Sequence, residues 1–181
     1  MGMLTRAAVT VDGHALDEVK TYLRIDGDAE DSTLTALIAT AIEQCEAHIG
    51  LAVLHRAMTE VLVPGAAWQK LTAAPVRVIS SVEMLSISGA TTLMSISDYE
   101  IDIDSEGSGR LRFLVPVSQK RVVVGFKAGL SVDWAGIGEG LRHGIVRLVA
   151  HYHVYRDRAE ELGPPAAVGA LWRASRRVRL L

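Results

Sequence analysis

The chain has 181 residues, of which 49% are hydrophobic and 22% charged, enough for one packed domain or one domain with a compact insertion. The formal net charge of −2 argues against a general nucleic-acid coat, which binds by neutralising phosphates. One cysteine excludes a disulfide within the chain. No apolar run approaches the roughly 20 residues that span a bilayer, and the N-terminus lacks the apolar stretch of a secretion signal, so we expect a cytoplasmic product.

The first third of the chain predicts two helices behind a short arm. Residues 1–14 are expected to form a flexible or loosely docked arm, and a first amphipathic helix begins near Ala15. An acidic turn follows. We expect Asp28 to cap the second helix, with Asp31 three residues on in a box-like arrangement, and Gly50 to end it.

Apolar side chains recur along the second helix at the spacing of one helical face. We expect this face to pack in the core or against another subunit. Cys45 lies on it and is interpreted as a small buried hydrophobe rather than a reactive thiol. The face comprises Leu34, Leu37, Ile38, Ala41, Ile42, Cys45 and Ile49.

Short alternating segments replace the helical pattern between about residues 57 and 130. Several short strands at this spacing predict an antiparallel sheet or a small sandwich. The expected strands are 59–63, 76–79 with 82–87 as one bent strand or two short ones, 99–104, 110–114 and 121–127.

Helical spacing returns at about 137–162, where Leu141, Ile145, Leu148 and Tyr152 share one face. The fold class is therefore α+β, with an N-terminal helical pair, a central antiparallel β segment, a long C-terminal helix and a basic tail helix. We expect residues 15–165 to form a single domain. Its parts are the helices at about 15–50 and 137–162 and the β segment at about 57–130.

Residues 166–181 form a basic tail that follows a Gly-Pro-Pro break and contains no acidic residue. One interpretation is a frayed, solvated terminus. The other is a docking peptide that orders on an acidic partner surface or contacts DNA phosphates, because Trp and Arg are favoured at interface hot spots. The candidate binding residues are Trp172, Arg173, Arg176, Arg177 and Arg179.

Patterns that resemble chemical sites fail on spacing. Asp102, Asp104 and Glu106 begin like a Ca²⁺ loop, but the later ligands are missing, which favours a solvated hairpin. His151 and His153 are two apart on a helix and point to different sides. A glycine-rich segment before the last long helix matches no nucleotide-binding pattern. We therefore expect no enzyme, no bound metal and no cofactor.

Four features, in this order, resemble the head–tail connector (adaptor) family of tailed bacteriophages, including the versions carried by gene transfer agents. The first two are LDEVKTYLRID at 16–26, before the acidic turn, and LTALIATAIEQCEAHIGLAV at 34–53. The third is the β segment that closes with VGFKAG at 124–129, and the fourth is LRHGIVRLVAHYHVYRDR at 141–158. Their shared order is more specific than any one of them.

The resemblance implies a structural subunit of a homo-oligomeric ring, commonly of twelve copies, at the neck of a virion or virion-like particle. The ring lies beneath the portal protein, which receives the C-terminal tail, and extends a channel through which double-stranded DNA passes without sequence-specific binding. It offers a platform to the next neck or tail-terminator protein. The implied subunit is made in the host cytoplasm and contacts no membrane.

A rival reading is a DNA-binding or DNA-packaging accessory protein. In that case the arginine-rich tail grips phosphates, and DNA affinity falls steeply as salt rises. The net charge of −2 and the acidic first half of the chain argue against it.

Overall fold

The computed structural model describes residues 2–155 and 164–177 of the chain. Helices and antiparallel sheets are both present, so the α+β fold class is confirmed. The chain divides into two compact units, each made from two separate segments. We call residues 1–8 with 55–129 the sheet unit, and residues 9–54 with 130–181 the helical unit.

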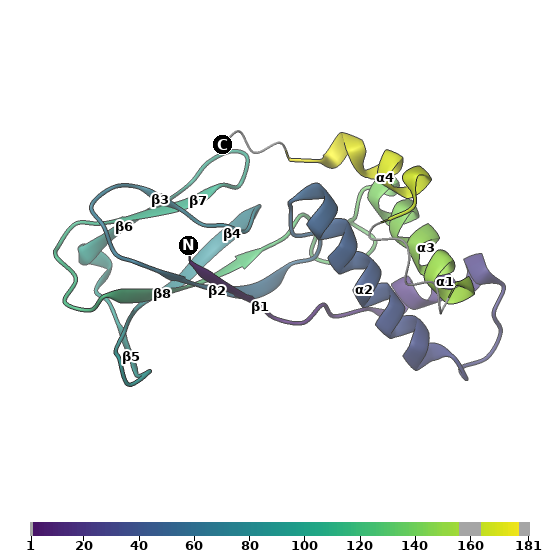
Figure 1. Cartoon of the computed structure of the whole chain (residues 1–181), viewed down its shortest axis with the longest axis horizontal. Coiled ribbons are helices and arrows are strands. Elements are labelled where there is room, and N and C mark those ends of the chain that lie inside the picture. Colours follow the sequence, from purple (N-terminus) through teal and green to yellow (C-terminus); the bar gives the residue numbers. More distant parts are fainter. Residues whose placement is uncertain (1, 156–163, 178–181) are drawn as a thin grey trace. The chain divides into compact units, whose positions relative to one another are not determined.

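Helices of the helical unit surround one hydrophobic core (Figure 1). The core is built from the apolar faces of all four α-helices, and the helical spacing in the sequence predicts those of the first three. The described helices are α1 (Gly13–Leu23), α2 (Asp31–Ile49), α3 (Glu139–Val154) and α4 (Ala166–Trp172), which the 3-10 turn η2 (Arg173–Ser175) follows.

The ends of α2 show one correct and one wrong prediction. Gly50 ends the helix with a left-handed φ of 74°, a conformation that glycine adopts without strain. The predicted Asp28 cap is wrong: Glu30 occupies the N-cap position and makes no side-chain capping bond. Asp31 instead forms an ion pair with Lys20, 2.7 Å away, which ties α2 to α1.

The sheet unit contains two antiparallel sheets (Figure 1). The larger has the strand order β1-β2-β8-β4-β5 and the smaller the order β3-β7-β6. The strands are β1 (Met3–Arg6), β2 (Arg56–Leu62), β3 (Gln69–Lys70), β4 (Val76–Leu85), β5 (Thr91–Leu93), β6 (Tyr99–Ile103), β7 (Gly109–Phe113) and β8 (Arg121–Ala128), with the 3-10 turn η1 (Ile96–Asp98) before β6.

The sequence pattern did not predict β1, and it left open whether β4 is one strand or two. Residues 3–6, which we expected in a loose arm, form β1 and pair with β2 in the register Met3 to Val61. The predicted segments 76–79 and 82–87 are one bent strand, β4, with two irregularities in its pairing with β8. Such bulges bend a strand and increase its twist.

Burial alternates along β2, so the five-stranded sheet has one buried and one open face. Met58 and Leu62 point into the core, together with Glu60, whose side chain is only 1% exposed. The Glu60 carboxylate accepts hydrogen bonds from the backbone N–H of Thr72, at 2.8 Å, and from the Thr72 hydroxyl. These partners offset the cost of burying a charge.

Candidate assembly site

The described part of the basic tail is held against the helical unit by Trp172. The indole is fully buried, and its Nε1–H donates to the carbonyl oxygen of Leu141 in α3 at 3.2 Å. Val168, one turn earlier in α4, is also buried. The sequence placed Trp172 among candidate contacts with a partner, and in this chain it packs within its own core.

Gly144 in α3 makes the seat for this indole. A Cβ at that position would overlap the Trp172 ring, so only glycine leaves the space. The ring of His48, from α2, lies 5.6 Å from the indole between ring centroids. Helices α2 and α3 of the same unit therefore hold the tail in place at Trp172.

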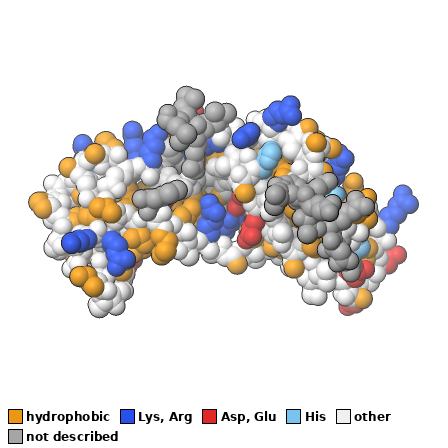
Figure 2. Space-filling model, viewed as in Figure 1, with side chains coloured by type: hydrophobic (Ala, Val, Ile, Leu, Met, Phe, Trp, Pro, Cys, Tyr) orange, Lys and Arg blue, Asp and Glu red, His pale blue; other side chains and the backbone are white. Residues whose placement is uncertain are grey.

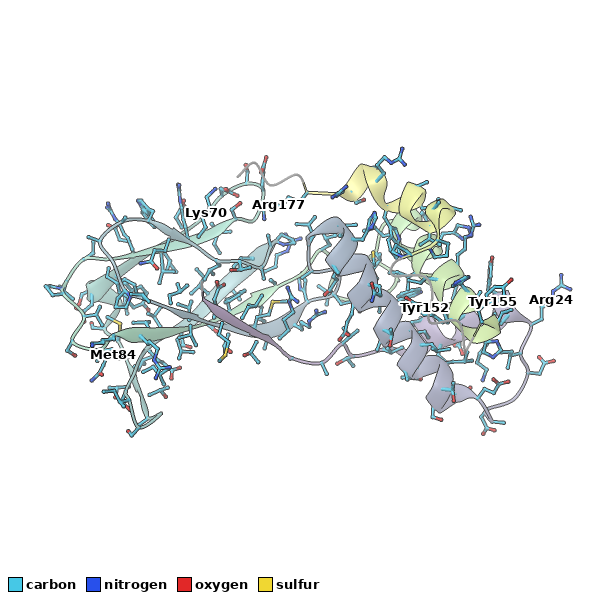
Figure 3. All side chains as sticks on the ribbon, in the orientation of Figure 1. Arg24, Lys70, Met84, Tyr152, Tyr155 and Arg177 are labelled. Carbon is cyan, nitrogen blue, oxygen red and sulfur yellow. The ribbon has the colours of Figure 1, made fainter. Side chains whose placement is uncertain are left out.

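Beyond Trp172 the chain turns along the end of α2. The backbone N–H of Arg177 donates to the carbonyl oxygen of Ile49 at 2.8 Å, which satisfies one of the carbonyls left unpaired at a helix C-terminus. Arg173 and Arg176 are exposed, whereas Arg177 is half-buried. Figure 2 shows Lys and Arg side chains on the surface over α4, and Figure 3 shows where Arg177 lies. Arg179 lies outside the described residues.

The predicted apolar faces of α2 and α3 lie inside the helical unit. Leu37 and Tyr152 are half-buried against the core, and burial raises the pKa of the Tyr152 hydroxyl. Figure 3 shows Tyr152 and Tyr155 near the end of α3. The fully buried members are Leu34, Ile38, Ile42, Ile145 and Leu148, and Leu141 is buried with 5% of its surface exposed.

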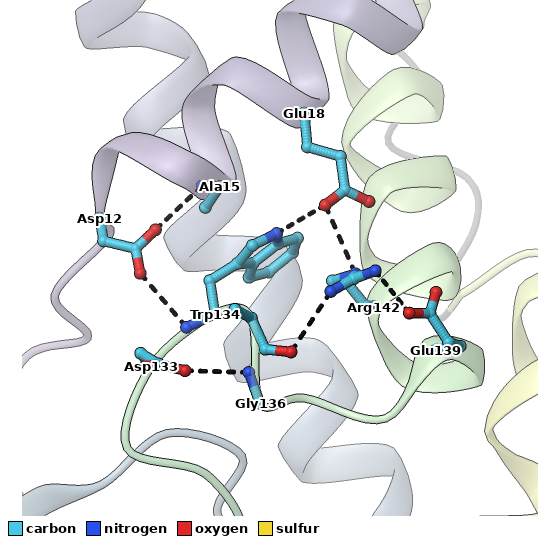
Figure 4. A network of polar contacts seen from close by, with 9 residues as sticks. Asp12, Ala15, Glu18, Asp133, Trp134, Gly136, Glu139 and Arg142 are labelled. Carbon is cyan, nitrogen blue, oxygen red and sulfur yellow. Dashed lines mark hydrogen bonds and ion pairs between the residues drawn. The ribbon is translucent and has the colours of Figure 1, made fainter.

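A polar network that the sequence analysis did not find fixes the start of α3 (Figure 4). Trp134 is 2% exposed, and its indole Nε1–H donates to the Glu18 carboxylate at 2.8 Å. Asp12 accepts from the backbone N–H of Trp134 at 3.2 Å. Arg142 donates to Glu139 at 2.6 Å and lies 3.4 Å from Glu18. This network joins α1 to the helix that carries the Trp172 seat.

In the acidic hairpin between β6 and β7, Asp102 and Asp104 are paired with groups of the same hairpin. Asp102 forms an ion pair with Arg110 across the two strands at 2.7 Å. Asp104 accepts from the backbone N–H groups of Glu106 and Ser108 at 3.0 and 2.8 Å. The bond from Ser108 is the main reason that the pKa of Asp104 lies below its ordinary value. This geometry is that of a capped hairpin loop.

The histidines of α3 face different neighbours. His153 lies 2.9 Å from the Glu30 carboxylate, between Nε2 and Oε2, and the His151 ring lies 4.9 Å from the Tyr155 ring. His143 is exposed. Within residues 2–155 and 164–177, no three His, Cys, Asp or Glu side chains gather closely enough to hold a metal ion. In the same residues, no helix is long and apolar enough to cross a membrane.

The chain is thus an α+β protein with a basic tail that packs on its helical unit. The family model of phage gp6-like head–tail connector proteins matches residues 14–104, just over half of the chain. The chain therefore belongs to the phage gp6-like head–tail connector family, and it is a structural head–tail connector subunit.

Solved structures agree over the full length. A chain from the neck of an empty GTA particle, computed with C6 symmetry, is 25% identical with a TM-score of 0.79. A chain from the virion of a native gene transfer agent particle is 26% identical with a TM-score of 0.75. Each match covers 99% of this chain and 97% of the other.

A third solved chain shares the fold. It comes from the neck of a native GTA particle computed with C12 symmetry, is 24% identical and has a TM-score of 0.76. No curated protein sequence matches this chain significantly.

Proposed function

We propose that this connector subunit forms a ring with further copies of itself in the neck of a tailed phage or a phage-like gene transfer particle. The observation that carries the proposal is the match over 99% of the chain to a neck protein at a TM-score of 0.79. The C6 and C12 symmetries of the matched necks support a ring, commonly of twelve copies. Repeated contacts around a closed ring give stability without strong single contacts.

The ring lies beneath the portal protein and extends the channel for double-stranded DNA, which passes without sequence-specific binding. Its other side receives the next neck or tail-terminator protein. The role is one of binding without catalysis, because the family and the matched chains are structural connector and neck proteins. The apolar balance of the chain, with a mean hydropathy of +0.24, suits a subunit that covers surface in an assembly.

The portal contact in this proposal is the basic tail, residues 166–181. Arg173 and Arg176 are the exposed cations of its described part, and Trp172 fixes the tail on the helical unit. Cations on a fixed scaffold bind an acidic groove with less loss of conformational entropy than a free peptide. Arg177 and Arg179 are further proposed contacts, and Trp172 contributes by holding the tail in place.

The test is charge reversal rather than deletion, since deletion of residues 166–181 would also remove Trp172 from the core. We expect the double variant Arg173→Glu with Arg176→Glu to bind its own portal at least about tenfold more weakly. Co-sedimentation with portal rings measures the affinity. The matched control is Arg24→Glu with Lys120→Glu, which changes the net charge equally at two other exposed positions.

The same experiment distinguishes the connector ring from the alternative, a DNA-binding accessory protein. Equal portal binding by both double variants and the unchanged chain would contradict tail docking. The other outcome is a chain that does not bind the portal at all but binds DNA, with an affinity that falls steeply as salt rises. In that case the accessory DNA-binding role replaces the connector ring. Negative-stain imaging of the co-sedimenting peak shows whether a ring has been added below the portal.

A further inference from the structure

The open face of the five-stranded sheet carries an apolar row that crosses every strand. Pairing aligns Met3 with Val61, Val61 with Val123, Val123 with Glu83, and Glu83 with Leu93. Met3 and Leu93, at the two ends of the row, are 68% and 69% exposed. Four of the five side chains in this row are therefore apolar. The described residues leave this face partly exposed.

A hollow of about 430 Å³ lies at the end of this sheet where β2 stops and β8 starts. Because a water molecule occupies about 30 Å³, the hollow is large enough for an aliphatic side chain and part of the loop that carries it. Val63, at its rim, is 72% exposed. Its lining is mostly apolar, from Met3, Val61, Leu62, Val63 and Leu85, and is completed by Gly2, Gln69 and Arg121.

The same unit also presents an apolar projection. The loop between β4 and β5 (Figure 1) carries Ile87, whose side chain is 94% exposed. The backbone N–H of Ser86 donates to Ala90 at 2.9 Å, and that of Gly89 donates to Ser86 at 3.1 Å. Gly89 has a φ of +87°, which suits glycine in this tight turn. Ile87 is thus held outward by a loop of fixed shape.

We propose that Ile87 of one copy seats in the hollow of the next copy around the ring. A closed ring joins two different surfaces of each subunit, so a subunit needs one projection and one complementary recess. The sheet unit provides both, and Figure 2 shows that hydrophobic side chains reach the surface of this unit. The contact removes from water side chains that are otherwise exposed, and the preformed loop loses little entropy on binding.

This inference rests on the proposed ring, and cross-linking between two cysteine variants tests it. Cys45 is the only cysteine of the chain and is fully buried. Burial, followed by the nearby Glu46 charge, raises its pKa and suppresses the reactive thiolate. Added cysteines at exposed positions are therefore the reactive thiols. Ile87→Cys and Val63→Cys are prepared separately, mixed in equal amounts, assembled on portal rings and treated with a short bismaleimide.

We expect more covalent dimer in the mixture than with either variant alone, because the contact places Ile87 of one copy against Val63 of the next. The control mixture pairs Ile87→Cys with Val132→Cys, an exposed position of the helical unit, and gives no such excess of dimer. Rings that are visible by imaging but yield no excess of dimer from the Ile87–Val63 mixture overturn the contact and leave the ring proposal standing. Failure of any ring to form overturns both.

A second variant pair measures the strength of the contact. Ile87→Lys places a cation in a recess that Arg121 also lines, so we expect at least about tenfold fewer rings at a given subunit concentration. Val132→Lys makes the same change at a position that is 75% exposed and should form rings within about twofold of the unchanged chain. Equal loss in both variants contradicts a specific role for Ile87.

Discussion

At the scale of single residues, Gly144 is the position where backbone and side-chain packing are most tightly linked. A methyl group there would overlap the Trp172 indole, although alanine is the better helix former. We expect Gly144→Ala to lower the free energy of unfolding by about 1–3 kcal/mol, because overpacking outweighs the gain in helix propensity. Urea unfolding followed by circular dichroism measures the change.

Gly140, one turn earlier in α3, is the matched control. A Cβ there meets only the carbonyl oxygen of Leu171, at an ordinary contact distance of 3.5 Å. Gly140→Ala should therefore be neutral or stabilise the chain by up to about 1 kcal/mol. If both alanine variants are equally stable, Trp172 does not depend on the space at Gly144.

Residue environments were predictable from sequence where they follow periodicity. The helical spacing of Leu34, Ile38 and Ile42 indicates a buried face whatever that face contacts. Trp172 has no such pattern, since it stands in a short tail after two prolines, and its seat depends on a glycine 28 positions earlier. The bond between Trp134 and Glu18 spans 116 positions, so no local spacing could indicate it.

At the scale of elements, the start of α1 depends on Asp12. Its carboxylate accepts from the backbone N–H of Ala15 at 2.9 Å and from that of Trp134 at 3.2 Å. We expect Asp12→Ala to cost about 1–3 kcal/mol of stability, more than the usual loss of about 1 kcal/mol for a simple cap. Thermal and urea unfolding check this value.

Asp17→Ala serves as the comparison because it removes an exposed carboxylate from the same helix. Its effect should stay within about 0.5 kcal/mol. A cost for Asp12→Ala no greater than for Asp17→Ala would show that the two backbone bonds add little to the stability of the helix start.

Long elements were predictable and short ones were not. The alternation in β2, β6, β7 and β8 is visible in the sequence because each strand has at least five residues. The strands β1, β3 and β5 have two to four residues, too few for a period of two to stand out. They are set by pairing with longer strands.

At the scale of the whole molecule, the order of segments along the chain conceals the division into two units. β1 pairs with a strand more than 50 positions away, so an N-terminal segment belongs to the sheet unit although helices follow it. Local patterns contain no information about such distant pairing. The single domain that we expected over residues 15–165 stays a prediction, and the two units show how to test it.

We expect the two units to unfold together, because the folding of either unit brings together the two chain segments from which the other is built. The helical unit pairs Leu54 with Ser131, and the sheet unit pairs Arg56 with Ala128, so both hold the ends of the segment 55–129 together. Closing a loop of about 75 residues costs roughly 4 kcal/mol from its length alone. A unit that folds alone bears this cost, and the second unit then folds onto ends that already meet.

Gly144→Ala makes this coupling measurable by hydrogen exchange. If the units unfold as one domain, the variant should speed exchange at the slowest amides of β8 by the same factor as at those of α3, although the substitution lies only in α3. The two factors come from mass spectrometry of peptides from each strand and helix. Faster exchange in α3 with unchanged exchange in β8 would establish two independently stable units. The coupling free energy from chain closure would then be smaller than the free energy of unfolding of the sheet unit.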